Sequence, residues 1–554
     1  MARAHQTEAW RQLQAHQAQL SSSDTRITEL FSRHPQRCTA LTFECGAIRA
    51  DFSKHLATPE TLNRLTQLAD ALGLPQSIAD LFSGAPLNST EQRPALHMAL
   101  RGLEVVANPH IRKTVDAALA QMETLVSAVH DGSWRGYAND VIRDVVNIGI
   151  GGSDLGPAMA TRALRAHHQD SVRCHFVSNV DPAHLHDCLA QLRPETTLFV
   201  VASKSFTTLE TMQNAEQARR WFIAAAGDQT RAQNLLHQHF VAVTTNREAA
   251  LAFGITDRQI FPMWDWVGGR FSLWSAIGLP IALAVGMPQF RQLLAGAAFV
   301  DQHFASAPMA ANVPVLMGLL AIWYRNFWGA GSHAVLPYAQ DLELLPGFLQ
   351  QLEMESLGKS VRHDGQAAEH DTGPVIWGSA GTNGQHSFHQ LLHQGSDLIP
   401  ADFIAVARPT VADNMTQHRH LLANCFSQSS AMMTGKTRQQ ALDEMLEEGI
   451  DALRAEALAA HKAVPGNRPS TTLLLDELNA FNLGSLIALY EHKVFVQSVI
   501  WDINAFDQWG VEIGKQLSKP AFAALNGDDA AVRSLDASSQ ALIRHCRRQH
   551  GSTI

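Results

Sequence analysis

The chain has 554 residues, too many for a single hydrophobic core, so its length predicts two or more domains. Its composition, 46% hydrophobic and 17% charged, is that of a soluble globular protein. A net charge of -9 without any run of Lys and Arg argues against a nucleic-acid-binding protein. The longest apolar stretches, 278–288 and 313–324, are shorter than the roughly 18 residues that a membrane-spanning helix needs.

The N-terminal segment and the cysteines predict a cytoplasmic location. Residues 1–20 are polar and helix-like, without the apolar core and small-residue cleavage site of a secretory signal. The six cysteines are scattered without a CxxC or a zinc-ligand spacing, so we expect reduced thiols. Close histidine pairs such as His184 and His186 come without a convincing set of further ligands. We therefore expect no metal and no other cofactor.

Hydrophobic periodicity divides the chain into two α/β blocks flanked by helices. Residues 1–120 have an apolar spacing near 3.6, which predicts a helical segment. From about residue 140, short β-branched runs alternate with helical patterns, and this alternation predicts parallel sheets covered by helices on both faces. The predicted strands are 144–150, 173–178, 197–202, 333–337, 403–407 and 471–475. The predicted domains are a helical segment over 1–120, α/β domains over 121–290 and 310–515, and a helical tail over 516–554.

A glycine-rich turn, 149–157 (GIGGSDLGP), follows the first predicted strand and precedes a helical pattern. Glycines there would let the backbone approach a ligand closely, and the start of the helix offers free N–H groups. A dinucleotide fingerprint, GxGxxG, would need glycine at the position of Asp154, and no GxxxxGK[ST] motif is present. Both nucleotide sites are therefore disfavoured, while a tight turn without any ligand stays open.

Hydroxyl groups crowd the segment 202–210 (ASKSFTTLE), which follows a buried type of strand and opens a helix. Thr207 and Glu210 have the spacing of a capping box, which would place the helix start. Hydroxyls, backbone N–H groups and the helix dipole together suit a phosphate, and Lys204 lies close by. An ordinary Ser/Thr-rich cap is the alternative. Because no nucleotide fingerprint exists elsewhere, a sugar phosphate is the favoured ligand.

Five segments resemble the glucose-6-phosphate isomerase family. Segment 265–278 (DWVGGRFSLWSAIG) is similar to the first family signature, and segment 498–515 (SVIWDINAFDQWGVEIGK) is similar to the second. Segments 351–356 (QLEMES) and 381–386 (GTNGQH) also look like that family, as does the upstream region 90–101. The resemblance extends from about residue 10 to about residue 520 and keeps the same order throughout.

The resemblance implies two sugar-isomerase (SIS)-type α/β/α domains and a cytoplasmic homodimer that acts without a cofactor, a nucleic acid or a membrane. It also implies the reversible isomerisation of glucose 6-phosphate to fructose 6-phosphate, in glycolysis and gluconeogenesis, by ring opening and proton transfer through a cis-enediolate. Carried over residue by residue, the substrate-binding residues would be Gly152, Ser153, Ser203, Lys204, Ser205, Thr208, Gly269, Gln351 and Gln508.

The same resemblance implies two groups for the proton transfer. Glu355 would be the base that moves the proton between carbons 2 and 1, and its i, i+4 spacing from Gln351 puts both side chains on one face of a helix. Arg270, after two glycines, would stabilise the enediolate with its fixed positive charge. In isolation, Glu355 would fit a solvated helix face, and Arg270 a structural salt bridge.

Ring opening is implied for two further residues. His386 resembles the acid/base of the family that reaches into the active site of the partner subunit, and a neutral imidazole can both give and take a proton. Lys515 resembles the residue that contacts the ring oxygen. It lies seven residues after Gln508, on one face if the segment is helical. An incidental histidine and a surface lysine are the alternatives.

The sequence departs from the family at several positions. Ser205 stands where members commonly have Thr, which keeps the hydroxyl. Leu357 replaces a common Asn, and Ser379 and Ala380 replace a usual Glu-Pro, at positions without a proposed catalytic role. Two rival functions remain: an isomerase that also accepts mannose 6-phosphate, and a sugar-phosphate-binding regulator. A regulator could lose its base, whereas here all four implied catalytic residues are present.

Overall fold

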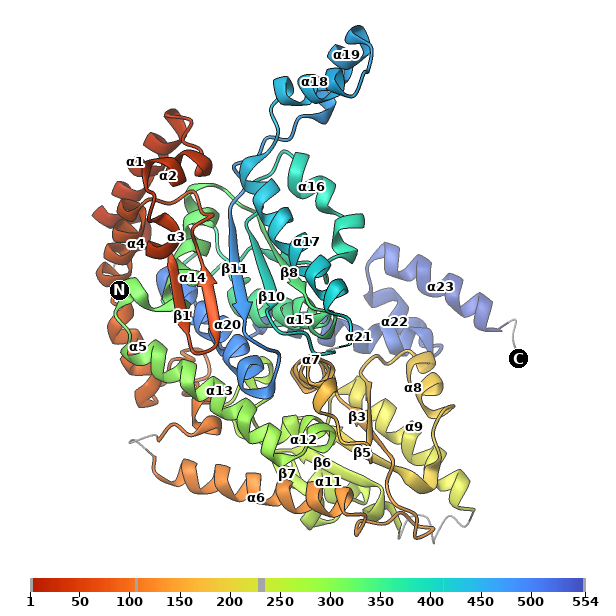
Figure 1. Cartoon of the computed structure of the whole chain (residues 1–554). Helices are drawn as coiled ribbons and strands as arrows, with labels where there is room; N and C mark the ends of the chain where they lie inside the picture. The colour runs from red at the N-terminus through yellow and green to blue at the C-terminus, as the bar shows by residue number, and fades with distance from the viewer. Residues whose placement is uncertain (1–2, 105–107, 228–234, 412, 552–554) are drawn as a thin grey trace. The chain divides into compact units, whose positions relative to one another are not determined.

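The computed structural model describes residues 3–104, 108–227, 235–411 and 413–551. Two mostly parallel sheets with helices packed against them confirm the predicted α/β class (Figure 1). No helix within these four ranges is long and apolar enough to cross a membrane.

The N-terminal part of the chain contains six α-helices in its described residues and one short hairpin. The helices are α1 (Glu8–Ser22), α2 (Ile27–Arg33), α3 (Arg37–Ala40), α4 (Pro59–Ala71), α5 (Leu74–Ser83) and α6 (His110–His130). The hairpin consists of β1 (Thr42–Cys45) and β2 (Ile48–Asp51), which pair antiparallel. The sequence pattern did not predict these strands. They extend the second sheet, because β2 pairs with its strand β11 (Ser470–Leu475).

The first sheet has five parallel strands in the order β4-β3-β5-β6-β7. The strands are β3 (Asp144–Ile148), β4 (Arg173–Val177), β5 (Thr197–Ala202), β6 (Phe240–Thr244) and β7 (Ile260–Pro262). The first three of these were predicted, whereas β6 and β7 were not. Every residue of β3, β5 and β6 is buried, as expected for parallel strands covered on both faces.

Helices cover both faces of this first sheet. On one face, α8 (Pro182–Leu189), α9 (Leu209–Ala226) and α11 (Arg247–Phe253) bury apolar side chains against the strands, for example Phe222 against Phe199 and Phe240. Helices α6 and α12 (Leu279–Val285) pack on each other and on strands of the sheet. Helix α7 (Leu155–Ala163) follows β3 through the glycine-rich turn.

The second sheet has six strands in the order β1-β2-β11-β10-β8-β9. Its parallel strands are β8 (Ser332–Tyr338), β9 (Val375–Trp377), β10 (Ala401–Val406) and β11. All but β9 were predicted. Helices α16 (His389–Gln394) and α17 (Met415–Thr434) bury Leu392 and Met432 against this sheet.

Several further helices lie in the part of the chain up to Ala505. The longest of them, α20 (Ala480–Trp501), is buried along almost its whole length. They are α13 (Met287–Ser306), α14 (Val313–Ile322), α15 (Leu345–Leu349), α18 (Arg438–Glu447), α19 (Ala452–Lys462) and α20 (Ala480–Trp501). Helix α20 packs on α13 and α14.

The described residues from Phe506 onward form a compact unit of their own. Its helices are α21 (Glu512–Leu525), α22 (Asp529–Ser534) and α23 (Ala537–Gly551). A small core contains Ala524, Val532 and Ile543. The exact residue limits of the two α/β domains stay a prediction.

Candidate active site

The glycine-rich turn and the hydroxyl cluster follow neighbouring strands. Strand β3 ends at Ile148 and β5 at Ala202, and the two strands are paired in parallel, with Ile148 opposite Val201. Because the carboxyl ends of parallel strands meet at one edge of a sheet, both segments lie at the edge where α/β proteins bind ligands.

The glycine-rich turn packs directly against the segment that carries Arg270. A β-carbon on Gly152 would lie 2.0 Å from the carbonyl oxygen of Gly269. The backbones of the two segments are therefore in direct contact. Gly151 has a φ of +58°, and a β-carbon there would lie 3.1 Å from Nε2 of Gln351. The glycines were expected to admit a ligand; here they bring three distant segments together.

Hydrogen bonds from side chains to backbone carbonyls also hold these two segments. Ser153 closes the 3-10 turn η3 (Gly151–Ser153), and its carbonyl accepts a hydrogen bond of 2.9 Å from Nδ2 of Asn147 on β3. The carbonyl of Gly269, at the start of the 3-10 turn η8 (Gly269–Phe271), accepts from the hydroxyl of Ser272 at 2.6 Å. The turn and the segment before Arg270 are thus fixed in place.

The hydroxyl cluster leaves the start of α9 uncapped by a side chain. The hydroxyl of buried Ser203 donates to Oγ1 of Thr208 at 3.2 Å, and Ser205 Oγ accepts from the hydroxyl of Thr207 at 2.7 Å. Thr208 is the N-cap residue and its side chain caps no N–H group. The predicted capping box of Thr207 and Glu210 is therefore wrong, because the Thr207 hydroxyl is bonded to Ser205 instead. An uncapped helix start with hydroxyls beside it suits an anion.

Lys204 connects the hydroxyl cluster to the segment before Arg270. Its Nζ lies 3.3 Å from Oδ1 of Asp265, and its carbonyl accepts hydrogen bonds from the backbone N–H of Thr245 and the hydroxyl of Thr244. The Asp265 side chain is largely exposed, and exposed ion pairs are weak. The ammonium of Lys204 can therefore exchange this partner for a bound anion.

Glu355 ends a π-helical turn, η13 (Gln350–Glu355), that continues α15. The helix expected around Gln351 and Glu355 is thus present, but with wider turns than an α-helix, a feature that is frequent at functional sites. Gln351 Nε2 donates a hydrogen bond of 3.1 Å to Oε2 of Glu355, so the two side chains do lie on one face. The Glu355 side chain is 21% exposed, which leaves its carboxylate accessible.

Arg270 is buried and its guanidinium is held at several points. Its Nε donates to Oγ of Ser356 at 2.6 Å, and its Nη2 donates to the carbonyl of Ala505. Nη1 lies 3.5 Å from Oε2 of Glu355. A fixed cation therefore stands beside an accessible carboxylate.

The neighbouring carboxylate, Glu353, has a different environment that the sequence pattern did not reveal. Its side chain is buried, and both of its oxygens lie 2.9 Å from Nζ of Lys493 on α20. Charged residues are almost never fully buried unless they are paired. The charged run 491–493 inside an apolar helical pattern was the available signal for such pairing.

Three predicted residues remain: His386 in a 3-10 turn, and Gln508 and Lys515 in the compact unit that begins at Phe506. His386 ends the 3-10 turn η14 (Asn383–His386) and is exposed, and its side chain makes no hydrogen bond or ion pair in the described part of the chain. Lys515 lies on α21, where its Nζ pairs with Oε1 of Glu512 at 2.8 Å. The common face of Gln508 and Lys515 was expected only if their segment is helical, and one helix does not include both residues: Gln508 precedes the 3-10 turn η15 (Trp509–Val511), and α21 begins at Glu512.

Two further points concern the departure at Leu357 and the expectation of no metal site. Leu357, the departure that follows the π-helical turn, is fully buried and packs against Gly373. In the ranges that the structure describes, no group of three or more His, Cys, Asp and Glu side chains is arranged to hold a metal ion.

Parallel sheets with polar groups at their carboxyl ends, a helix start open to an anion, and a carboxylate beside a fixed guanidinium define an α/β enzyme for an anionic substrate. The family model described as phosphoglucose isomerase matches residues 51–543, and the chain belongs to the phosphoglucose isomerase family.

Proteins named glucose-6-phosphate isomerase are similar to this chain over almost its whole length. Glucose-6-phosphate isomerase of Pseudomonas fluorescens strain Pf-5 is 52% identical over 548 residues, which cover 98% of this chain and 97% of that protein. The enzyme of the same name from Hahella chejuensis is 51% identical over 549 residues, with the same coverage. Among solved structures, a glucose-6-phosphate isomerase from Chlamydia trachomatis is 30% identical and superposes with a TM-score of 0.83, covering 96% of this chain and 98% of that one.

Proposed function

We propose that this protein is an enzyme that interconverts glucose 6-phosphate and fructose 6-phosphate, a reversible step of glycolysis and gluconeogenesis. The observation that carries this proposal is the accessible carboxylate of Glu355, held between the amide of Gln351 and the buried guanidinium of Arg270. The family and the relatives named glucose-6-phosphate isomerase, similar over 98% of the chain, support it.

The substrate phosphate would bind at the uncapped start of α9. The hydroxyls of Ser203, Ser205 and Thr208 and the ammonium of Lys204 supply donors there, and the N–H groups of the first turn supply more. Gly152 and Ser153 follow the neighbouring strand and would line the same side of the substrate. The sugar chain would then extend from the phosphate toward Gly269 and Gln351, which lie against the glycine-rich turn.

Proton transfer would use Glu355 and Arg270. In the open-chain aldose, Glu355 takes the proton from carbon 2, and the electron pair of that C–H bond forms the C1–C2 double bond while negative charge develops on oxygen 1. The Arg270 guanidinium stabilises this charge. The hydroxyl proton of oxygen 2 then passes to oxygen 1, Glu355 returns its proton to carbon 1, the carbonyl forms at carbon 2, and the ketose results. Each step needs an acid or base and no electron acceptor, so the reaction calls for no redox cofactor.

Ring opening would depend on His386 and Lys515, with Gln508 as a further contact to the substrate. The side chain of His386 is exposed and has no hydrogen-bond partner in the described part of its own chain, which suits a residue that acts on a second subunit. We therefore propose a cytoplasmic homodimer in which each active site takes His386 from the partner.

A coupled assay for glucose 6-phosphate formed from fructose 6-phosphate tests the proposal. It compares chelator-treated wild type with Glu355→Gln, and calorimetry measures the binding of fructose 6-phosphate to both. Activity in the wild type alone, with binding retained in the variant, is the expected result, because an amide cannot act as the base. Binding without activity in the wild type would instead favour the sugar-phosphate-binding regulator.

A further inference from the structure

Helix α20 contains three consecutive ionisable residues in its buried interior. Glu491, His492 and Lys493 are each at most 2% exposed, and the positions around them in the helix are apolar. Burying a charge is costly unless it is paired, and even paired charges often stabilise a fold less than apolar residues of the same size. Stability alone therefore does not explain the run, and the partners of these residues indicate another role.

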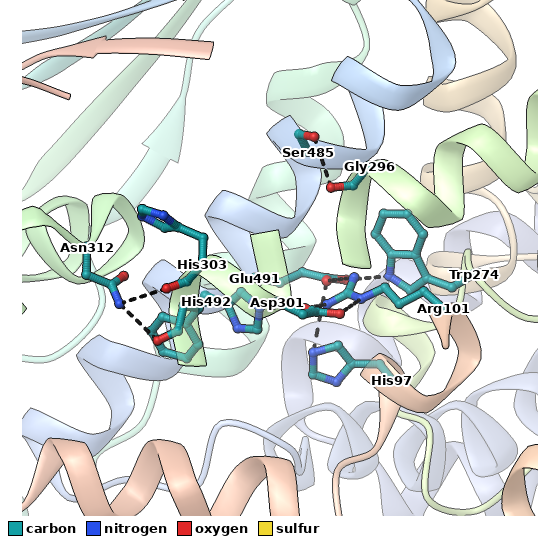
Figure 2. Close-up of polar contacts among 11 residues, drawn as sticks. His97, Arg101, Trp274, Gly296, Asp301, His303, Asn312, Ser485, Glu491 and His492 are labelled. Atoms are coloured by element: carbon teal, nitrogen blue, oxygen red, sulfur yellow. Dashed lines mark hydrogen bonds and ion pairs between the residues drawn. The ribbon is translucent and has the colours of Figure 1, made fainter. Parts of the chain in front are cut away.

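Glu491 holds the segment that follows Arg270. Its Oε1 accepts a hydrogen bond of 2.8 Å from the indole N–H of Trp274, four residues after Arg270, and its Oε2 accepts one of 2.6 Å from Arg101 (Figure 2). The Arg101 guanidinium also lies over the ring of Trp274, 4.7 Å from its centroid. Trp274 is fully buried, so the segment has a fixed end on α20.

The same network is closed on its other side by Asp301 of α13. Asp301 accepts hydrogen bonds of 2.6 and 2.7 Å from Arg101, and it lies 2.7 Å from Nε2 of His492 (Figure 2). Arg101 is therefore bound by two carboxylates, and its position is set by two helices that pack on each other. A bidentate guanidinium–carboxylate pair is geometrically specific, so Glu491 is held in one orientation.

Lys493 holds the turn that carries Glu355. Its Nζ lies 2.9 Å from both oxygens of Glu353, and both side chains are at most 2% exposed. Glu353 belongs to the π-helical turn η13 and precedes Glu355 by two residues. The ammonium therefore fixes this turn two residues before Glu355.

Side chains two residues apart on an α-helix point in directions that differ by about 200°, and they are about 3 Å apart along the helix axis. Glu491 and Lys493 thus reach two segments on opposite sides of α20, and these segments bring Nη1 of Arg270 within 3.5 Å of Oε2 of Glu355. We propose that Glu491 and Lys493 are positioning residues that set the placement of Arg270 relative to Glu355. This inference rests on the proposed function, in which these two groups act on one substrate.

The test compares three kinds of variant in the coupled assay. Trp274→Phe removes the indole N–H that binds Glu491, and the paired change Lys493→Met with Glu353→Gln removes both buried charges of the second link. Ser485→Ala is the matched control: this buried serine of α20 donates to the carbonyl of Gly296 on α13 at 2.9 Å (Figure 2) and belongs to neither link. Glu491→Gln, which keeps the shape of the side chain, replaces Trp274→Phe if that variant does not fold.

Both test variants should lower kcat on the order of 10- to 100-fold with KM changed less than about threefold, since a small misplacement of catalytic groups affects turnover most. Ser485→Ala should keep the wild-type kcat. In an Arg270→Lys background, Trp274→Phe should cause a much smaller loss, because the group that it positions is already altered.

Three results would overturn the inference: wild-type kcat in both folded test variants, an equal loss in Ser485→Ala, or a loss from Trp274→Phe that is undiminished in the Arg270→Lys background. An active wild type together with any of these would leave the proposed function intact. An inactive wild type that still binds fructose 6-phosphate would overturn the proposed function and this inference together.

Discussion

Glu353 and Glu355 are separated by one residue but differ in burial and in their partners. Glu353 is buried and has both oxygens on Lys493, whereas Glu355 is partly exposed and faces a neutral amide and a guanidinium. The sequence alone does not distinguish them, because both belong to the same helical pattern. Their partners, which come from distant parts of the chain, decide that Glu355 is the one that a substrate can reach.

Arg270 should contribute to turnover more than to binding. Arg270→Ala removes the cation beside Glu355, and the loss of one such stabilising donor is typically worth about 3 kcal/mol, or on the order of 100-fold in kcat. Steady-state kinetics with fructose 6-phosphate measure both constants. A higher KM with an unchanged kcat would show that Arg270 binds the substrate and does not stabilise the enediolate.

Asp154 in the glycine-rich turn should make the protein less stable as the pH rises. Burial raises the pKa of this carboxyl from about 3.8 to about 6, against the opposing hydrogen bond from Ser178. The folded state therefore binds the proton more tightly than the unfolded state, and stability falls between about pH 4 and pH 6, by about 1.4 kcal/mol for each unit of pKa difference.

Asp154→Asn removes this carboxyl, so its midpoint of thermal unfolding should exceed that of the wild type at pH 7.5, and the difference should shrink at pH 4.5. Thermal melts at both pH values measure the shift. An equal shift at the two pH values would contradict the assignment.

At the scale of elements, the site depends on the close contact between two glycine segments. Gly152→Ala would place a methyl group 2.0 Å from the carbonyl oxygen of Gly269, so one backbone must move. We expect at least about a tenfold loss of kcat/KM from this variant, because the displaced segment carries Arg270. Gly347→Ala is the matched control: Gly347 lies in α15, a β-carbon added there would meet open space, and alanine favours a helix. Equal activity of the two variants would contradict the proposed packing.

Strong local patterns made most of the buried strands predictable. Thr197–Ala202 and Ser470–Leu475 are apolar runs between turns, and both were found within one residue of their bounds. The pattern failed for β1 and β2, whose exposed residues interrupt the apolar signal, and for the three-residue strands β7 and β9. Phe240–Thr244 is as apolar as the strands that were found and was overlooked.

The polar segments that follow β3 and β5 were also predictable, since a strand followed by glycines or hydroxyls marks a sheet edge. The π-helical form of the turn before Glu355 was not, because an apolar period does not distinguish it from an α-helix. The link from Lys493 to Glu353 joins residues 140 positions apart, and only the folded chain shows it.

On the scale of the whole molecule, the residues implied in the reaction are divided among separate parts. Glu355 and Arg270 come together within the part of the chain up to Ala505, whereas Gln508 and Lys515 belong to the compact unit that begins at Phe506. The side chain of His386 is exposed and makes no hydrogen bond in the described part of its own chain. A homodimer in which each active site takes His386 from the partner subunit would account for this exposure.

Mixing two inactive variants should restore activity if His386 acts across subunits. Glu355→Gln and His386→Ala are denatured, combined in equal amounts and refolded. Random pairing of subunits would then give about one quarter of the active sites an intact Glu355 and an intact His386. The coupled assay should recover up to about that fraction of the wild-type rate. No recovery from a mixture that has refolded to dimers would place both residues in the same subunit.

Exchange with solvent of the proton that Glu355 is proposed to move tests the mechanism most directly. Fructose 6-phosphate is equilibrated with wild type or Glu355→Gln in D₂O, and NMR follows deuterium at carbon 2 of the glucose 6-phosphate formed. The wild type should incorporate deuterium over many turnovers, because a carboxylic acid exchanges its proton with solvent, and Glu355→Gln should not. Incorporation at the wild-type rate in Glu355→Gln would contradict the role of this base, and isomerisation by the wild type without any incorporation would contradict proton transfer itself.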